Sequence, residues 1–154
     1  MHEGPISTLL GLAGIPSISE STMIERDAAI ALYEGGRCHM LHLSSAESMG
    51  AVERARGAGA KVTAEVTPHH LLMTDEAVRS SAYDTNTKMN PPLRGESDRQ
   101  ALLAALKDGT VDCIATDHAP HTIDDKRVEY DHAAFGILGL VFLAANWFFT
   151  LLSF

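Results

Sequence analysis

Cysteines and basic residues are scarce in this sequence, and it shows no secretory signal. Only Cys38 and Cys113 are present among 154 residues, too few for the disulfide framework that holds small secreted domains together. Both lie in apolar stretches typical of strands, so we expect buried, reduced thiols. No basic segment followed by an apolar run opens the chain. These features together predict a cytoplasmic protein.

The charge balance is acidic, with 12 Lys and Arg residues against 20 Asp and Glu residues and a formal net charge of -8. Because an acidic surface repels phosphate backbones, we exclude nucleic acid as a partner. Hydrophobic residues make up 45% of the chain, which is enough for a buried core and excludes intrinsic disorder.

Strand and helix patterns alternate along the chain. Three stretches have the composition of strands: Arg37–Leu43, Lys61–Val66 and Val111–Thr116. Three others have helical spacing: Ser21–Glu34, Ser44–Ala58 and Asp98–Lys107. The second helix opens with Ser44 and Glu47, a potential capping box. This alternation predicts an α/β fold built from βαβ units, with a parallel sheet.

Chemically active residues follow each predicted strand. His42 ends the first strand, His69 and His70 follow the second, and Asp117 follows the third. The carboxyl ends of parallel strands carry functional groups in barrels and in open sheets alike. Three strands therefore deliver imidazole or carboxylate groups to one face of the molecule.

The segment from Asp117 to His121 (DHAPH) is the densest of these sites. A carboxylate at a strand tip, followed by imidazoles, can bind a divalent metal or exchange protons with a bound water. Alternatively, Asp117 caps a helix and the histidines are solvated. A lone strand histidine such as His42 is usually a core residue, but its position beside Asp117 favours a ligand. Strand alternation predicts that His42 and His39 point to opposite faces.

Two other segments are harder to assign. His69 and His70 are adjacent, so in a strand their side chains would diverge and could not easily chelate one ion. A supporting role is as good an interpretation as catalysis. Residues 86–94 form a polar loop stiffened by two prolines, with amide and guanidinium groups suited to a polar, anionic or imide-bearing small molecule. The alternative is a plain crossover loop.

Five motifs then occur in a characteristic order: EVTPHHLLMT, KMNPPLR, DRQALL, IATDHAPH and FGILGL. With them the chain resembles the latter part of a class I dihydroorotase, an enzyme of pyrimidine biosynthesis in the amidohydrolase superfamily. The likeness runs from Met1 to about Leu140. It is specific, because related hydantoinases share the strand-end Asp-His but typically not the MNPPLR or TDHAPH motifs.

The resemblance implies that residues 1–140 are the C-terminal portion of a (β/α)8 TIM-barrel metal-dependent hydrolase, an incomplete barrel with about three βα units. It implies a two-metal zinc site in which His42 binds one ion and Asp117 binds the other, with Asp117 also as the catalytic group. It further implies that Asn90 and His121 hold the substrate ring and its carboxylate.

The resemblance also gives Phe135 and Gly136 a backbone contact with the substrate. His69, His70 and Arg94 receive no role from it.

The implied reaction is the zinc-dependent, reversible hydrolysis of the cyclic amide of dihydroorotate to N-carbamoyl aspartate. A whole barrel typically needs ~250 residues, and the His-x-His motif of the family is absent from this sequence. We therefore expect this chain alone to be an inactive fragment. Two alternatives are a related cyclic amidase, such as a hydantoinase, and a non-catalytic dihydroorotase-like subunit. The subunit would pack on an aspartate transcarbamoylase, and a homo-oligomer is a further expected assembly.

Residues 141–154 form a divergent apolar tail that holds five of the nine aromatic residues. No charged residue occurs from Ala133 to Phe154. A continued barrel helix, a shifted reading frame or truncated gene, and a membrane anchor would each produce such a stretch. The anchor is disfavoured by Asn146, Thr150 and Ser153, which interrupt the apolar run.

Overall fold

A computed structural model describes residues 1–140, and the apolar tail lies outside these described residues. The elements are α1 (Pro5–Leu10), α2 (Ile18–Glu34), β1 (Arg37–Met40), α3 (Ala46–Gly57), β2 (Lys61–Val66), α4 (Pro68–Leu72), α5 (Glu76–Ser80), the 3-10 helix η1 (Thr85–Thr87), α6 (Glu96–Asp108), β3 (Cys113–Ile114) and α7 (Ile123–Lys126). Within residues 1–140, no helix is both long enough and apolar enough to cross a membrane.

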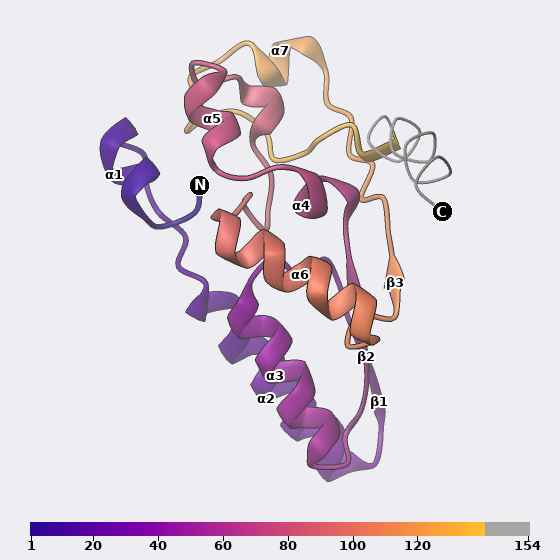
Figure 1. The fold of residues 1–154 in the computed structure, drawn as a ribbon. Helices are drawn as coiled ribbons and strands as arrows, with labels where there is room; N and C mark the ends of the chain where they lie inside the picture. Colours follow the sequence, from indigo (N-terminus) through magenta and orange to yellow (C-terminus); the bar gives the residue numbers. More distant parts are fainter. Residues whose placement is uncertain (141–154) are drawn as a thin grey trace, which may run out of the picture.

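The predicted parallel sheet is confirmed, with strand order β1-β2-β3. In β1 and β2 the register runs from Arg37 opposite Lys61 to Met40 opposite Ala64. In β2 and β3 it places Glu65 opposite Cys113. Because all three strands run the same way, their carboxyl ends meet at one end of the sheet, beside α4, α5 and α7 (Figure 1).

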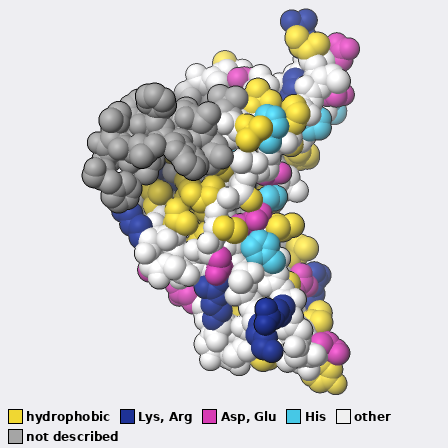
Figure 2. Space-filling model, turned by 90° about the vertical axis from the view of Figure 1, so that its right-hand side faces the viewer, with side chains coloured by type: hydrophobic (Ala, Val, Ile, Leu, Met, Phe, Trp, Pro, Cys, Tyr) yellow, Lys and Arg dark blue, Asp and Glu magenta, His cyan; other side chains and the backbone are white. Residues whose placement is uncertain are grey.

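Three helices, α2, α3 and α6, pack together and cover one face of the sheet (Figure 1). The core beneath them is aliphatic: Ile24, Ala28, Met40, Leu43, Met49, Ala51, Val52, Ala60, Val62, Ala64, Val66, Leu71, Leu102, Ala105 and Val111. Figure 2 looks at the side on which the strands lie, and there histidine, acidic and apolar side chains reach the surface.

The predicted element bounds differ from the observed ones mainly at the strand ends. The strand Lys61–Val66 is confirmed as predicted, whereas β1 stops at Met40 and β3 pairs over two residues only. Beyond β1 and β3, His42 and Asp117 adopt left-handed conformations with φ of 54° and 42°. Extended pairing cannot continue through a residue in that conformation.

The capping box predicted at Ser44 and Glu47 is wrong by one residue. Ser45 is the N-cap of α3, and its hydroxyl accepts a hydrogen bond from the Ser48 amide at 3.3 Å. Ser44 instead donates its amide to Glu20 Oε1 at 2.9 Å, and its hydroxyl bonds the same carboxylate. Because Ser44 is bound to Glu20 on α2, Ser45 takes the capping position instead.

The expectation of buried thiols is also wrong. Cys38 is half-buried and Cys113 is exposed. Cys113 lies on the two-residue strand β3 at the edge of the sheet, where none of the three covering helices shields it.

The spacing of Leu102, Leu103 and Leu106 predicts one buried face on α6. All three contact the core, and Leu102 is the most buried of the three, with 1% exposure. We expect Leu102→Ala to lower the free energy of unfolding by about 2–5 kcal/mol, since it removes buried methyl groups and leaves a cavity. Urea denaturation of the full chain measures this. The matched control is Ile30→Ala on α2, whose side chain is exposed. Equal losses in both variants would contradict the assigned core.

Candidate metal centre

His42 and Asp117 come from different strand ends and meet across the carboxyl end of the sheet. His42 Nε2 lies 3.6 Å from Asp117 Oδ1, and both side chains are about three-quarters buried. The left-handed backbone at each residue turns its side chain out of the strand direction. Such conformations are costly for residues other than glycine, and they cluster at functional sites.

A third residue, Glu65 on β2, joins this pair. Its Oε1 lies 2.7 Å from His42 Nδ1, and only 6% of the residue is exposed. His42 therefore lies between two carboxylates, one at each ring nitrogen. Sequence reasoning missed Glu65, although an acidic residue within a largely buried, β-branched strand was a signal.

His39 approaches the same carboxylate from β1. Its Nε2 lies 3.0 Å from Glu65 Oε2, and its Nδ1 lies 2.7 Å from Thr63 Oγ1. The prediction that His39 and His42 face opposite ways is wrong, because β1 ends before His42 and strand alternation no longer applies. Cys113 completes a second group of donors, since its sulfur and donor atoms of His39 and Glu65 lie within 4.8 Å of one another.

The segment after Asp117 is tied to the FGILGL motif. His121 Nε2 lies 2.7 Å from the carbonyl oxygen of Phe135, and Ala119 donates its amide to the Ile137 carbonyl at 3.1 Å. Gly136 fits here only as glycine, because an added Cβ would lie 2.4 Å from the Ala119 oxygen and 2.7 Å from the His121 ring. His121, Phe135 and Gly136 thus form one structural unit.

Asn90 and Arg94 belong to the same predicted polar loop but lie in different surroundings. Asn90 is exposed, next to a cis peptide bond to Pro91. Arg94 is buried and donates to Ser44 Oγ at 3.0 Å and to the Ile15 carbonyl at 2.6 Å. The expectation that this guanidinium serves an anionic ligand therefore does not hold, since its contacts are internal.

His69 and His70 follow β2, as predicted, and lie on the short helix α4. His70 Nδ1 lies 2.7 Å from Thr67 Oγ1, and its Nε2 lies 3.0 Å from the Pro91 carbonyl oxygen. Burial lowers the pKa of His69 to about 3 and that of His70 to about 4. Both imidazoles are neutral at pH 7, and His70 supports the loop that carries Asn90.

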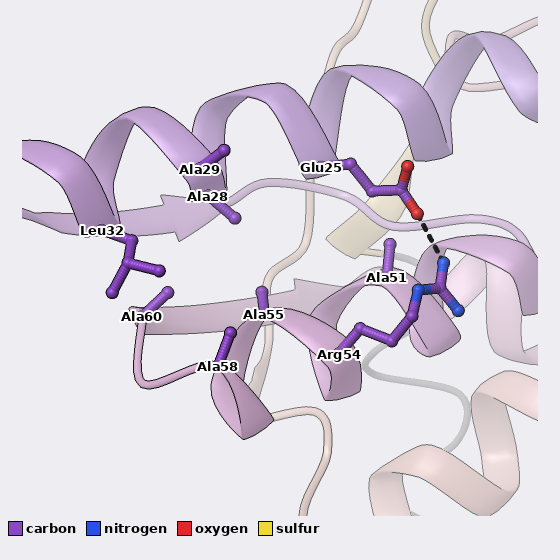
Figure 3. Close-up of a pocket in the computed structure, with 9 residues that line it drawn as sticks. All are labelled: Glu25, Ala28, Ala29, Leu32, Ala51, Arg54, Ala55, Ala58 and Ala60. Atoms are coloured by element: carbon purple, nitrogen blue, oxygen red, sulfur yellow. Dashed lines mark hydrogen bonds and ion pairs between the residues drawn. The ribbon is translucent and has the colours of Figure 1, made fainter.

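A separate pocket lies between α2 and α3 (Figure 3). It is lined mostly by alanines, and an ion pair of Arg54 and Glu25, 2.5 Å apart, spans it. Its lining residues Ala58 and Ala60 precede β2, at the opposite end of the strand from Asp117 and His42. The pocket therefore does not contribute to the candidate metal centre.

The buried His70 predicts an acid-sensitive fold. In the unfolded chain its pKa returns to about 6.5, so lowering the pH from about 6.5 to about 4 protonates the unfolded state preferentially and lowers the free energy of unfolding. We expect His70→Asn to weaken this pH dependence, measured by urea denaturation between pH 7 and pH 4. His132→Asn is the control, because its side chain is 78% exposed. An unchanged pH dependence in His70→Asn would refute the prediction.

Curated relatives of this chain carry the name dihydroorotase. The protein from Pelotomaculum thermopropionicum is 54% identical over 140 residues, which are 91% of this chain and 32% of that protein. The protein from Thermoanaerobacter sp. is 55% identical over the same shares. The chain thus spans about a third of the length of these relatives. No family model matches it.

Solved structures agree in fold. An L-hydantoinase from Arthrobacter aurescens has a TM-score of 0.75 and 26% identity, covering 81% of this chain and 28% of that one. A dihydropyrimidinase from Brevibacillus agri has a TM-score of 0.73 and 22% identity, over 80% and 28% of the two chains. The dihydroorotase from Saccharomyces cerevisiae has a TM-score of 0.58 and 22% identity, over 71% and 32%.

Proposed function

Because this chain is a relative of the dihydroorotases, similar over 91% of its own length and 32% of theirs, we propose that it supplies one part of a dihydroorotase active site. The reaction is the reversible hydrolysis of the cyclic amide of dihydroorotate to N-carbamoyl aspartate. The observation that carries the proposal is the approach of His42 Nε2 to Asp117 Oδ1, 3.6 Å apart at two strand ends.

In this proposal, residues 1–140 are one portion of a (β/α)8 barrel. Three parallel strands support this, since the first two are each followed by a helix and β3 by the loop that carries Asp117. The solved structures of similar fold are also more than three times as long as the matched region. The missing strands would pair with the edges of β1 and β3.

The donor set fits a zinc ion. His42 Nε2 and Asp117 Oδ1, 3.6 Å apart, offer an imidazole nitrogen and a carboxylate oxygen, the donor types that zinc accepts in catalytic sites, and each would bind one ion of the two-metal site. Imidazole nitrogen and carboxylate oxygen are also accepted by manganese and cobalt, so the choice of zinc follows the family. When bound, the metal would polarise the amide carbonyl and acidify a water molecule.

Asp117 is the proposed proton carrier. Its carboxylate would accept the proton of the attacking water and return it to the departing amide nitrogen. Asn90 and His121 would hold the ring and its carboxylate, and the backbone at Phe135 and Gly136 would line the substrate. The Lys126 ammonium supports this last segment, because it donates to the carbonyl oxygen of Gly136 at 2.8 Å.

A chimera tests the proposal. Residues 1–140 replace the matching third of the Pelotomaculum dihydroorotase, and turnover of dihydroorotate is measured by chromatography. We expect activity, and a fall in kcat of at least about 100-fold in Asp117→Asn, since general acid–base groups typically contribute 10²–10⁴-fold. Asp124→Asn is the control, because this exposed carboxylate lies on α7. A folded but inactive chimera, or full activity in Asp117→Asn, would contradict the assignment.

Two further measurements separate the alternatives. Hydantoin offered to the same chimera tests the related cyclic amidase, and preferential turnover of hydantoin would favour it. The 154-residue chain alone is expected to show no turnover of dihydroorotate. Its recovery from cells in a stable complex with a transcarbamoylase would instead favour the non-catalytic subunit.

A further inference from the structure

Three neighbouring strands each bring a different kind of metal-binding atom to one point on the sheet. The donors are an imidazole nitrogen of His39 on β1, a carboxylate oxygen of Glu65 on β2 and the sulfur of Cys113 on β3, and all lie within 4.8 Å of one another. Glu65 pairs directly with Cys113 in the parallel ladder, so the two side chains project from the same face. His39 pairs with Thr63, which lies two residues before Glu65 and therefore also shares this face.

Glu65 has an oxygen that the surrounding residues leave unsatisfied. Only 6% of the residue is exposed, and its Oε2 lies 3.0 Å from His39 Nε2. Its Oε1 forms no hydrogen bond with any residue in the range 1–140, although it lies 2.7 Å from His42 Nδ1. Burying a carboxylate oxygen without a hydrogen bond is costly, and a bound ion is one of the groups that removes this cost. The buried carboxylate therefore points to a cation.

His39 and Cys113 give an ion access to this carboxylate. Both residues are exposed, whereas Glu65 is buried, so an ion can enter from solvent through the first two donors. The second ring nitrogen of His39, Nδ1, lies 2.7 Å from Thr63 Oγ1, and a partner in this position orients a metal-binding imidazole. Cys113 is a free cysteine, and its thiolate form is a metal ligand.

We propose that His39, Glu65 and Cys113 together bind a zinc ion. Zinc accepts imidazole nitrogen, carboxylate oxygen and thiolate sulfur, whereas magnesium and calcium are bound by oxygen ligands. Three protein ligands leave the fourth tetrahedral position to a water molecule. The site is separate from the pair of His42 and Asp117, and it does not depend on the proposed function.

A plain ion pair of His39 and Glu65 is the simpler interpretation of the same contacts. In that case Cys113 lies beside the pair without taking part, and any bound ion would be held by nitrogen and oxygen atoms alone. The candidate metal centre of His42 and Asp117 likewise offers an imidazole and a carboxylate but no sulfur. A sulfur ligand on the bound ion therefore identifies the proposed site, provided that the sulfur is that of Cys113.

Cobalt chloride is the probe of the first experiment, because cobalt takes the same donors as zinc and shows a charge-transfer absorption band when a thiolate binds it. The full 154-residue chain is titrated without oxygen, in a phosphine reductant. We expect a saturable band that zinc chloride removes. Cys113→Ser should abolish the band, whereas the matched control Cys38→Ser should keep it, because Cys38 is outside the cluster. No band in the wild-type chain, or a band lost only in Cys38→Ser, would overturn the proposal.

The second experiment uses the same band to test the other two donors. His39→Phe and Glu65→Gln should each weaken cobalt binding by at least about tenfold, since losing the outer partner of a ligand already costs roughly 10–100-fold. Thr63→Val, which keeps the side-chain size but removes the hydroxyl beside the ring, should weaken binding about tenfold. If Glu65→Gln does not fold, as judged by circular dichroism, the variant of the exposed His39 decides. Unchanged affinity in His39→Phe, or in a folded Glu65→Gln, would overturn the three-donor site.

Asp117→Asn separates this site from the candidate metal centre. The substitution removes the carboxylate that lies 3.6 Å from His42 Nε2, and the thiolate band should persist with unchanged affinity. A band that disappears in Asp117→Asn would place the ion at that centre and overturn the proposal. Turnover by the chimera, measured separately, decides the proposed function, so a missing band leaves that function standing.

Discussion

The parallel pairing of β2 with both of its neighbours is the constraint on which the rest of the structure depends. β2 lies between β1 and β3, so the ends of all three strands arrive at the same level. This alignment brings His42, Glu65 and Asp117, which are distant in sequence, into contact. The sheet is stabilised in turn by the aliphatic core beneath α2, α3 and α6.

A second set of buried polar contacts connects the helices to this sheet edge. Glu20 on α2 accepts hydrogen bonds from the amide of Ser44 and from the hydroxyl of Ser48 at 2.6 Å. Arg94 reaches the same place from the loop before α6 and donates to Ser44 Oγ. Because buried polar groups are costly when unpaired, this cluster specifies the path of three chain segments just beyond His42.

The surroundings of the candidate metal centre follow from this arrangement. The more accessible pair of His42 and Asp117 lies beside the buried carboxylate of Glu65, and α4 adds two buried, neutral histidines nearby. The likeness to dihydroorotases covers 91% of this chain but only about a third of the relatives' length.

The sequence by itself determined the α/β class, the β2 strand, the apolar face of α6 and the position of His42 and Asp117 at strand ends, because these depend on local periodicity and on short motifs. Only the tertiary structure decided which groups surround them. It paired Glu65 with two histidines, selected Ser45 instead of Ser44 as a cap, buried Arg94 and exposed Cys113. The first three of these outcomes depend on partners from distant segments, which local patterns cannot show. Strand alternation fails where a left-handed residue ends the strand.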